Sequence, residues 1–169
     1  MFGKVKTLQE LFRIELSYAY DCEKKLVEKD LPSMIENANS SQLRSALQEH
    51  LAETRSQVVR LERVFSSINM QPDTKSNDIF DEMTAAAKDS ISNIDQSPLR
   101  DAGLIVNGNI VEHYEIALYG SLSAFARTLG LQEASSLLEE TLREEKNADA
   151  KLTQIGEAMM NAQARSQSA

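Results

Sequence analysis

Apolar residues recur at spacings of three and four along most of the chain, which is the pattern of α-helices with one buried face. The first stripe follows the segment TLQE, in which Thr7 and Glu10 have the spacing of a helix-capping box. Pro32 interrupts this stripe, because a proline inside a helix removes a backbone donor and crowds the preceding turn. We therefore predict that the first helix ends before Pro32. The stripe consists of Leu8, Leu11, Phe12, Ala19, Cys22 and Leu26.

Three further long helices follow from the same periodicity. The second runs from about Ser41 to Ile68. The third begins at SPLRDAG, where Ser97 is a good N-cap and Pro98 suits the first turn. It ends at LGLQ, where Gly130 is a natural C-cap residue. The fourth runs from about Glu133 to Asn161.

The lengths of the connections predict how these helices are arranged. The links between helices one and two and between helices three and four are short, whereas the link between helices two and three can cross the whole bundle and carries a short helix near residues 78–93. Bundles with one such crossover are ferritin-like. We predict an all-α, ferritin-like antiparallel four-helix bundle. It would be one domain over residues 1–163, followed by a flexible tail over residues 164–169.

Composition and charge limit the classes of partner. Hydrophobic residues make up 41% of the chain and charged residues 26%, which is typical of a globular protein. The net charge of −8 and the absence of a basic stripe argue against nucleic acid as a partner. No apolar run is long enough for a bilayer, and the N-terminus lacks the apolar core of a signal peptide. We expect a cytoplasmic protein that binds neither nucleic acid nor membrane.

Several acidic residues fall on faces that the apolar pattern predicts to be buried. In the segment GNIVEHYEIALYG, residues 108–120, Glu112 and Glu115 lie one turn apart among apolar positions. His113 lies off this line, and we interpret it as a packing or hydrogen-bonding residue. Glu145 and Asp149 fall on the inner face of the fourth helix, again one turn apart. Buried carboxylates without partners are costly, so these positions point to a function.

The first two helices supply further candidates. Glu23 flanks the apolar face of the first helix, and Glu15 is a rival on the same helix. On the second helix, His50 and Gln57 lie on the apolar face, and Glu53 lies at its edge. The four helices of the predicted bundle therefore bring acids toward one level of the core.

Convergent carboxylates repel one another, so either most of them take up protons or cations bind among them. An oxygen-rich site with few imidazoles suits iron or manganese, and two metal ions bridged by glutamates are known in such bundles. We predict two metal ions per chain, with iron as the first choice and manganese as the alternative. The predicted metal ligands are Glu23, His50, Glu53, Glu112, Glu115, Glu145 and Asp149.

The segments VEHYEIALYGSL, EHLAET, YDCEKKL and TLREEKNADAKLTQI together resemble the YciF/YciE-like family of ferritin-like proteins, over roughly residues 5 to 158. The resemblance implies a dimetal-carboxylate bundle that takes part in bacterial stress responses and is often dimeric. The pair of Glu112 and Glu115 is also similar to the third-helix glutamate pair that serves the iron centre of rubrerythrins. The ligands that the resemblance implies are Glu23, Glu53, Glu112 or Glu115, and Glu145.

One feature departs from the dimetal pattern. That pattern has a histidine three residues after the glutamate of helices two and four, where this chain has Ser56 and Ala148. His50, three residues before Glu53, is a candidate substitute, and Gln57 and Asp149 are further candidates. The identity of the ligands is therefore open from the sequence alone.

Two functions of different class follow. The first is a dimetal oxidoreductase that oxidises ferrous iron or reacts with oxygen or peroxide. The alternative is a non-catalytic structural or protein-interaction bundle, in which a metal site is structural or vestigial. Acids on all four helices favour the first, and the missing helical histidines favour the second. In either case we expect a homodimer.

Overall fold

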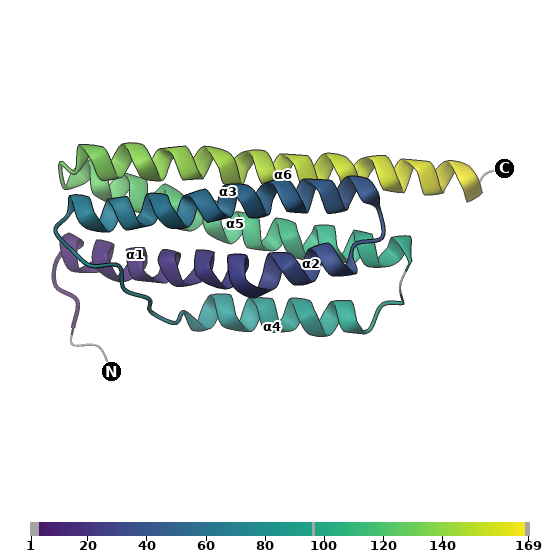
Figure 1. Cartoon of the computed structure of the whole chain (residues 1–169), viewed down its shortest axis with the longest axis horizontal. Coiled ribbons are helices and arrows are strands. Elements are labelled where there is room, and N and C mark those ends of the chain that lie inside the picture. The colour runs from purple at the N-terminus through teal and green to yellow at the C-terminus, as the bar shows by residue number, and fades with distance from the viewer. Residues whose placement is uncertain (1–3, 96, 168–169) are drawn as a thin grey trace.

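The computed structural model describes residues 4–95 and 97–167, with side chains up to residue 159. All of the secondary-structure elements in these residues are helices. Four long helical segments form an antiparallel bundle, and one shorter helix lies beside it (Figure 1). The predicted ferritin-like four-helix arrangement with a helix in its crossover is confirmed. None of the helices in the described part of the chain has the length and apolarity needed to cross a membrane.

The first helical segment continues through Pro32, so the predicted interruption there is wrong. It consists of α1 (Leu8–Lys25), a π-helical turn η1 (Leu26–Asp30) and α2 (Leu31–Asn37), which follow one line in Figure 1. In the π turn the amide of Leu31 donates to the carbonyl of Leu26, five residues back. The wider turn places Pro32 in the first turn of α2, where a proline needs no donor. The capping box of Thr7 and Glu10 is confirmed.

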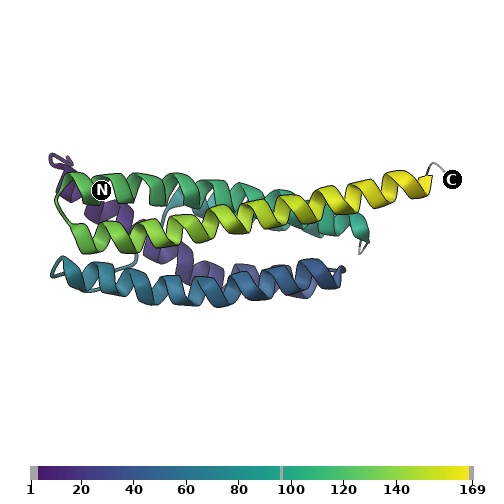
Figure 2. The same cartoon turned by 90° about the horizontal axis from the view of Figure 1, so that it is seen from above.

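The other helices begin and end close to their predicted bounds. Ser97 caps the helix that begins at Pro98 by accepting a hydrogen bond from the amide of Leu99. Gly130, just after the end of the same helix, has the positive φ that is typical of a residue that terminates a helix. The last helix runs past the others (Figure 2) and beyond its predicted end. The predicted flexible tail, 164–169, includes residues 168 and 169, which lie outside the described residues. The helices are α3 (Ser41–Ser67), α4 (Asp78–Ser92), α5 (Pro98–Thr128) and α6 (Gln132–Gln167).

The crossover is a consequence of helix direction. α1 contacts α3 and α5, and α6 contacts the same two helices, so each helix has antiparallel neighbours. Because α3 and α5 run in the same direction, the chain must travel the length of the bundle between them (Figure 1). α4 lies in this crossover and packs on α5 at Gly103, where an added Cβ would lie 2.9 Å from the side chains of Ile91 and Ile94. Lys25 of α1 also pairs with Asp81 of α4 at 2.5 Å.

The core consists of two apolar clusters with a polar layer between them. One cluster contains Phe12, Leu61 and Leu122, and the other contains Leu26, Leu47, Leu104 and Leu152. On each of the four long segments the chain passes from one cluster to the other, and apart from Ala148 the buried positions between them are polar. Five of the seven predicted metal ligands, Glu23, His50, Glu112, Glu115 and Glu145, lie in this layer. Its buried members are Glu23, His50, Thr54, Gln57, Glu112, Glu115, Thr141 and Glu145.

A buried carboxylate fixes the end of the bundle where the crossover rejoins it. Asp101 of α5 is 2% exposed and accepts hydrogen bonds from the amides of Asn39 and Ser40 at 2.7 and 2.8 Å. These amides belong to the turn before α3, where backbone donors lack helical partners. Asp101 therefore ties the start of α5 to the link between α2 and α3.

We predict that Asp101→Asn lowers the free energy of unfolding of the metal-free protein by about 2 kcal/mol, because the amide replaces one charged acceptor by a donor. Urea denaturation followed by circular dichroism measures this change. Asp89→Asn, at an exposed position on α4, is the matched control and should leave the stability unchanged. Equal stability of the Asp101 variant and the control would contradict this role.

Candidate metal centre

Four buried side chains of the polar layer converge on one point. His50 of α3, Glu112 and Glu115 of α5, and Glu145 of α6 each offer one nitrogen or oxygen atom, and these atoms lie within 4.8 Å of one another. The Nε2 atom of His50 lies 3.2 Å from Oε1 of Glu112 and 4.0 Å from Oε2 of Glu145. Glu112 and Glu115 share a face of α5 because they are three residues apart. The cluster thus has the ligand types and the spacing of a metal site.

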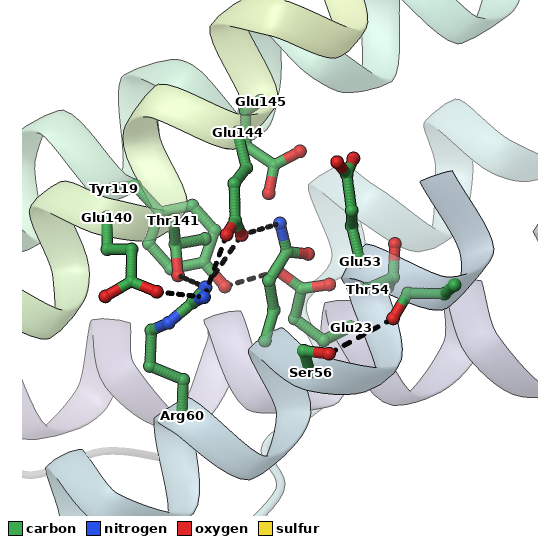
Figure 3. A network of polar contacts seen from close by, with 12 residues as sticks. Glu23, Glu53, Thr54, Ser56, Arg60, Tyr119, Glu140, Thr141, Glu144 and Glu145 are labelled. Carbon is green, nitrogen blue, oxygen red and sulfur yellow. Dashed lines mark hydrogen bonds and ion pairs between the residues drawn. The ribbon is translucent and has the colours of Figure 1, made fainter. Parts of the chain in front are cut away.

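A fourth acid, Glu23, approaches this cluster from α1. Its side chain is fully buried, and its Oε1 atom accepts a short hydrogen bond from the hydroxyl of Tyr119. Figure 3 shows Glu23 and Glu145 projecting from different helices toward the interior of the bundle. Next to Glu23, the thiol of Cys22 donates to Oε1 of Glu115 at 3.7 Å. The polar layer therefore receives a carboxylate from α1 as well as from α5 and α6.

Each of these four carboxylates has at least one buried oxygen atom that makes no hydrogen bond. Among the described residues, these buried atoms are Oε2 of Glu23, Glu112 and Glu115, and both carboxylate oxygens of Glu145. Buried polar atoms are almost always hydrogen-bonded, since an unpartnered one costs free energy. So many orphaned oxygens in one place are the property expected of ligands to a cation. Three carboxylates and one imidazole, with Glu23 beside them, fit iron or manganese.

Glu53 and Asp149 lie outside the cluster. The Glu53 side chain is 51% exposed, and its Oε2 atom is 3.8 Å from Nδ1 of His50. Asp149 is half-buried and faces the exposed His113, with 3.5 Å between its Oδ1 atom and Nε2 of that histidine. Glu15, the rival on α1, is half-buried and is also outside the cluster. His50 is the imidazole of the cluster, since His113 points to the surface.

Gln57 and Glu144 belong to a separate network at the edge of the polar layer, in which Figure 3 shows Glu144 beside Arg60. Gln57 is buried and donates through Nε2 to Oε2 of Glu144 at 3.0 Å. Both oxygens of Glu144 accept from the guanidinium of Arg60, at 2.7 and 2.8 Å, and Arg60 also donates to Thr141 and Glu140. Arg60 thus neutralises Glu144 and keeps it out of the cluster. Sequence reasoning overlooked Arg60, although its spacing of three from Gln57 was a signal.

The positions at which the dimetal pattern has histidines contribute no ligand. Ser56 is exposed and donates to the carbonyl of Ala52 in its own helix. Ala148 is buried beside the cluster, lining a cavity that also contacts His50 and Glu112. A single imidazole therefore serves a site that is otherwise built from carboxylates.

The electrostatics of the cluster reflect burial and crowding of like charge. Burial, followed by repulsion from Glu23, raises the pKa values of Glu115 and Glu145 well above the ordinary value. Burial also raises the pKa of Glu23 to about 7, although the hydrogen bond from Tyr119 acts in the opposite direction. Burial opposes the charge on His50, but Glu112 outweighs it and the pKa of His50 rises well above its ordinary value. Without a cation, the cluster therefore retains protons near neutral pH.

Comparison with known proteins gives a family and close structural relatives. Residues 7–165 match the family described as "Domain of unknown function (DUF892)". The protein YciF of Escherichia coli (strain K12) is 36% identical over 152 residues, which cover 89% of this chain and 91% of YciF.

Three solved structures are similar to this fold. The structure of the E. coli stress protein YciF has a TM-score of 0.87 at 34% identity and covers 93% of this chain and 99% of its own. YcfI of Rhodopseudomonas palustris, described as a putative structural protein, has a TM-score of 0.86 at 35% identity and covers 90% and 98%. A protein from Xanthomonas campestris, 21% identical with a TM-score of 0.71, supports the fold alone. The resemblance drawn from the sequence is thereby confirmed, and the chain belongs to the DUF892 family of YciF-like stress proteins.

Proposed function

We propose that this chain is a stress-response protein whose polar layer binds two metal ions, iron or manganese, and supports oxidation of ferrous iron or reaction with oxygen or peroxide. The observation that carries the proposal is the set of buried carboxylate oxygens without hydrogen-bond partners on α1, α5 and α6. His50 adds an imidazole from α3. Donors from all four long segments of one bundle are the arrangement that dimetal-carboxylate proteins use.

The roles of the residues follow from their positions. Glu112, Glu115, Glu145 and His50 would hold the metals, and Glu23 would complete the set from α1. Bound iron or manganese supplies the change of valence that oxygen or peroxide chemistry requires. The apolar clusters on either side exclude water, which strengthens the interaction between carboxylates and cations. Metal binding would release the protons that Glu115, Glu145 and His50 otherwise retain.

A polar passage supports access of cations to this layer. A cavity of about 140 Å³ between α3 and α6 is lined by Glu49, Glu53 and Lys151 near the surface and by His50 and Glu112 inside. The contact with His50 lowers the pKa of Glu53, so this exposed carboxylate stays charged at the outer end. We propose that Glu53 attracts cations to the passage, which gives it a part in metal binding without a place in the cluster.

A second candidate function is non-catalytic. The single imidazole of the cluster departs from the dimetal pattern, and the similar R. palustris protein is described as a putative structural protein. In this alternative the chain assembles as a homodimer, and any bound metal only stabilises the bundle. Oxygen uptake separates the two functions: ferrous protein that consumes oxygen is an oxidoreductase, and ferrous protein that consumes none is structural.

We predict that Glu145→Gln lowers the affinity for Mn²⁺ and for anaerobic Fe²⁺ by at least about tenfold, because it removes a charged donor from the centre of the cluster. Isothermal titration calorimetry measures the affinity and the number of ions bound. The variant should also lose oxygen consumption after ferrous loading.

The matched control is Glu157→Gln, an exposed glutamate on the same helix. It should bind metal as the parent protein does. If Glu145→Gln binds Mn²⁺ and Fe²⁺ as tightly as this control, the cluster is not the metal site.

The raised pKa values predict an unusual dependence of stability on pH. A buried acid whose pKa is higher in the folded than in the unfolded state stabilises the fold when protonated, so this stability disappears as pH rises through the folded pKa. For Glu23 the window runs from the ordinary value of 4.5 to about 7, and its loss costs on the order of 3 kcal/mol. The metal-free protein should therefore be more stable near pH 5 than near pH 8, as measured by urea denaturation with a chelator present.

Glu23→Gln should reduce this dependence, because the amide carries no titrating proton and still accepts from Tyr119. Glu28→Gln, at an exposed position in the following turn, should leave it unchanged. Saturating Mn²⁺ should reverse the trend in the parent protein, since metal competes with protons for the same oxygens. A metal-free protein that gains stability between pH 5 and pH 8 would refute the assigned charge balance.

A further inference from the structure

A second and larger cavity reaches the cluster from the side of the crossover helix. It has a volume of about 210 Å³ and lies between η1 and α2 on one side and α4 and α5 on the other. His50 and Glu112 form its inner end. We infer that this cavity binds a small, mainly apolar organic molecule next to the metal centre. Its role as a substrate rests on the proposed function, whereas binding itself does not require a metal.

The walls of the cavity are apolar along most of its length. They include Leu26, Leu31, Met34, Ile91, Leu104 and Leu152. Polar groups gather where α4 meets the bundle, and Lys88 of α4 pairs there with the buried carboxylate of Asp30 at 2.6 Å. An apolar cavity with a few polar groups at its ends is the usual form of a small-molecule site. The occupant should therefore be apolar over most of its surface.

The volume limits the size of the occupant. An engineered apolar cavity of about 150 Å³ in another protein stays dry and takes up benzene. The present cavity is larger, so an aromatic ring with a short alkyl chain matches its volume. A long-chain lipid would exceed it.

Local structure on both sides maintains this space. The π turn η1 contributes Leu26 and Asp30 to the wall, and π turns inside α-helices often occur at functional sites. On the other side, Ala87 and Ile91 of α4 form the outer wall. Figure 1 shows α4 lying outside the four-helix bundle, alongside the segment that contains α2. The crossover thus covers a cavity that the bundle alone would leave open.

The two cavities have different chemical character although both end at His50 and Glu112. The smaller one has carboxylates and an amine at its outer end, which suits a cation. The larger one has mainly aliphatic walls, which suit an apolar molecule, and the carboxylate of Asp30 on its wall is already paired with Lys88. The structure therefore provides separate routes for the metal and for an organic substrate.

Butylbenzene is a suitable test ligand for the metal-free protein. We expect saturable binding of one molecule per chain by isothermal titration calorimetry. Ala87→Phe, which fills the cavity from α4, should weaken this binding by at least about tenfold. Ala86→Phe, the adjacent exposed position, adds the same ring outside the cavity and should bind butylbenzene as the parent does. Ala87→Leu provides a smaller filling side chain should the phenylalanine variant fold poorly.

A second measurement places the ligand beside the metal centre. In the Co²⁺-loaded protein, butylbenzene should shift the visible absorption of the metal, and Ala87→Phe should abolish the shift. No saturable binding by the metal-free protein, or equal binding by the Ala87 and Ala86 variants, would overturn the inference. Binding without a change in the Co²⁺ spectrum would overturn the placement at the site. A protein that binds butylbenzene but no metal would refute the proposed function and leave the cavity assignment standing.

Discussion

The fold depends on how four buried glutamates are kept together in the middle of a helical bundle. Glu23, Glu112, Glu115 and Glu145 lie between two apolar clusters, where water cannot screen their charges. Hydrogen bonds from Tyr119 and Cys22 and the contact with His50 satisfy only part of their oxygen atoms. Such a layer is stable either with protons on its carboxylates or with cations among them. The metal-binding proposal and the predicted pH dependence both follow from this constraint.

The surrounding structure is consistent with a centre that must be reached from outside. A polar passage leads to His50 and Glu112 between α3 and α6, and an apolar cavity leads to the same residues beneath α4. The crossover helix therefore does more than connect the two hairpins, since it completes one wall of the apolar cavity. Arg60 pairs with Glu144 at the edge of the layer and separates that acid from the cluster. The acid at the edge of the layer is therefore neutralised by Arg60, whereas the glutamates of the cluster have no arginine or lysine partner among the described residues.

Much of the fold could be predicted from the sequence because the ends of helices are determined by residues that are close together in the chain. The capping box at Thr7, the N-cap at Ser97 and the stop at Gly130 depend on neighbouring residues alone, and all three are confirmed. The predicted end of the first helix before Pro32 was wrong because the effect of this proline depends on the preceding π turn. Periodicity assumes α-helical geometry throughout, so it contains no signal for the wider turn that accommodates the proline.

The candidate site was predictable to a lesser extent. A helical wheel identifies which acids lie on an apolar face, which is why Glu115 and Glu145 of the buried cluster were among the predicted ligands. It does not fix the rotation of each helix against its neighbours, so an edge position such as Glu53 falls on the solvent side while His50 turns inward. Asp149 contacts His113 on another helix instead of the cluster. Contacts between helices, such as that of Arg60 with Glu144, depend on packing that the sequence pattern does not specify.

The most direct test of the central claim is the metal content of protein purified without chelator, measured by inductively coupled plasma mass spectrometry and followed by anaerobic ferrous titration of the same sample. The account predicts iron or manganese approaching two ions per chain, or uptake of ferrous iron to that level. Protein that contains no metal and binds neither added iron nor added manganese would contradict it, and would leave the glutamate layer as a protonated structural element.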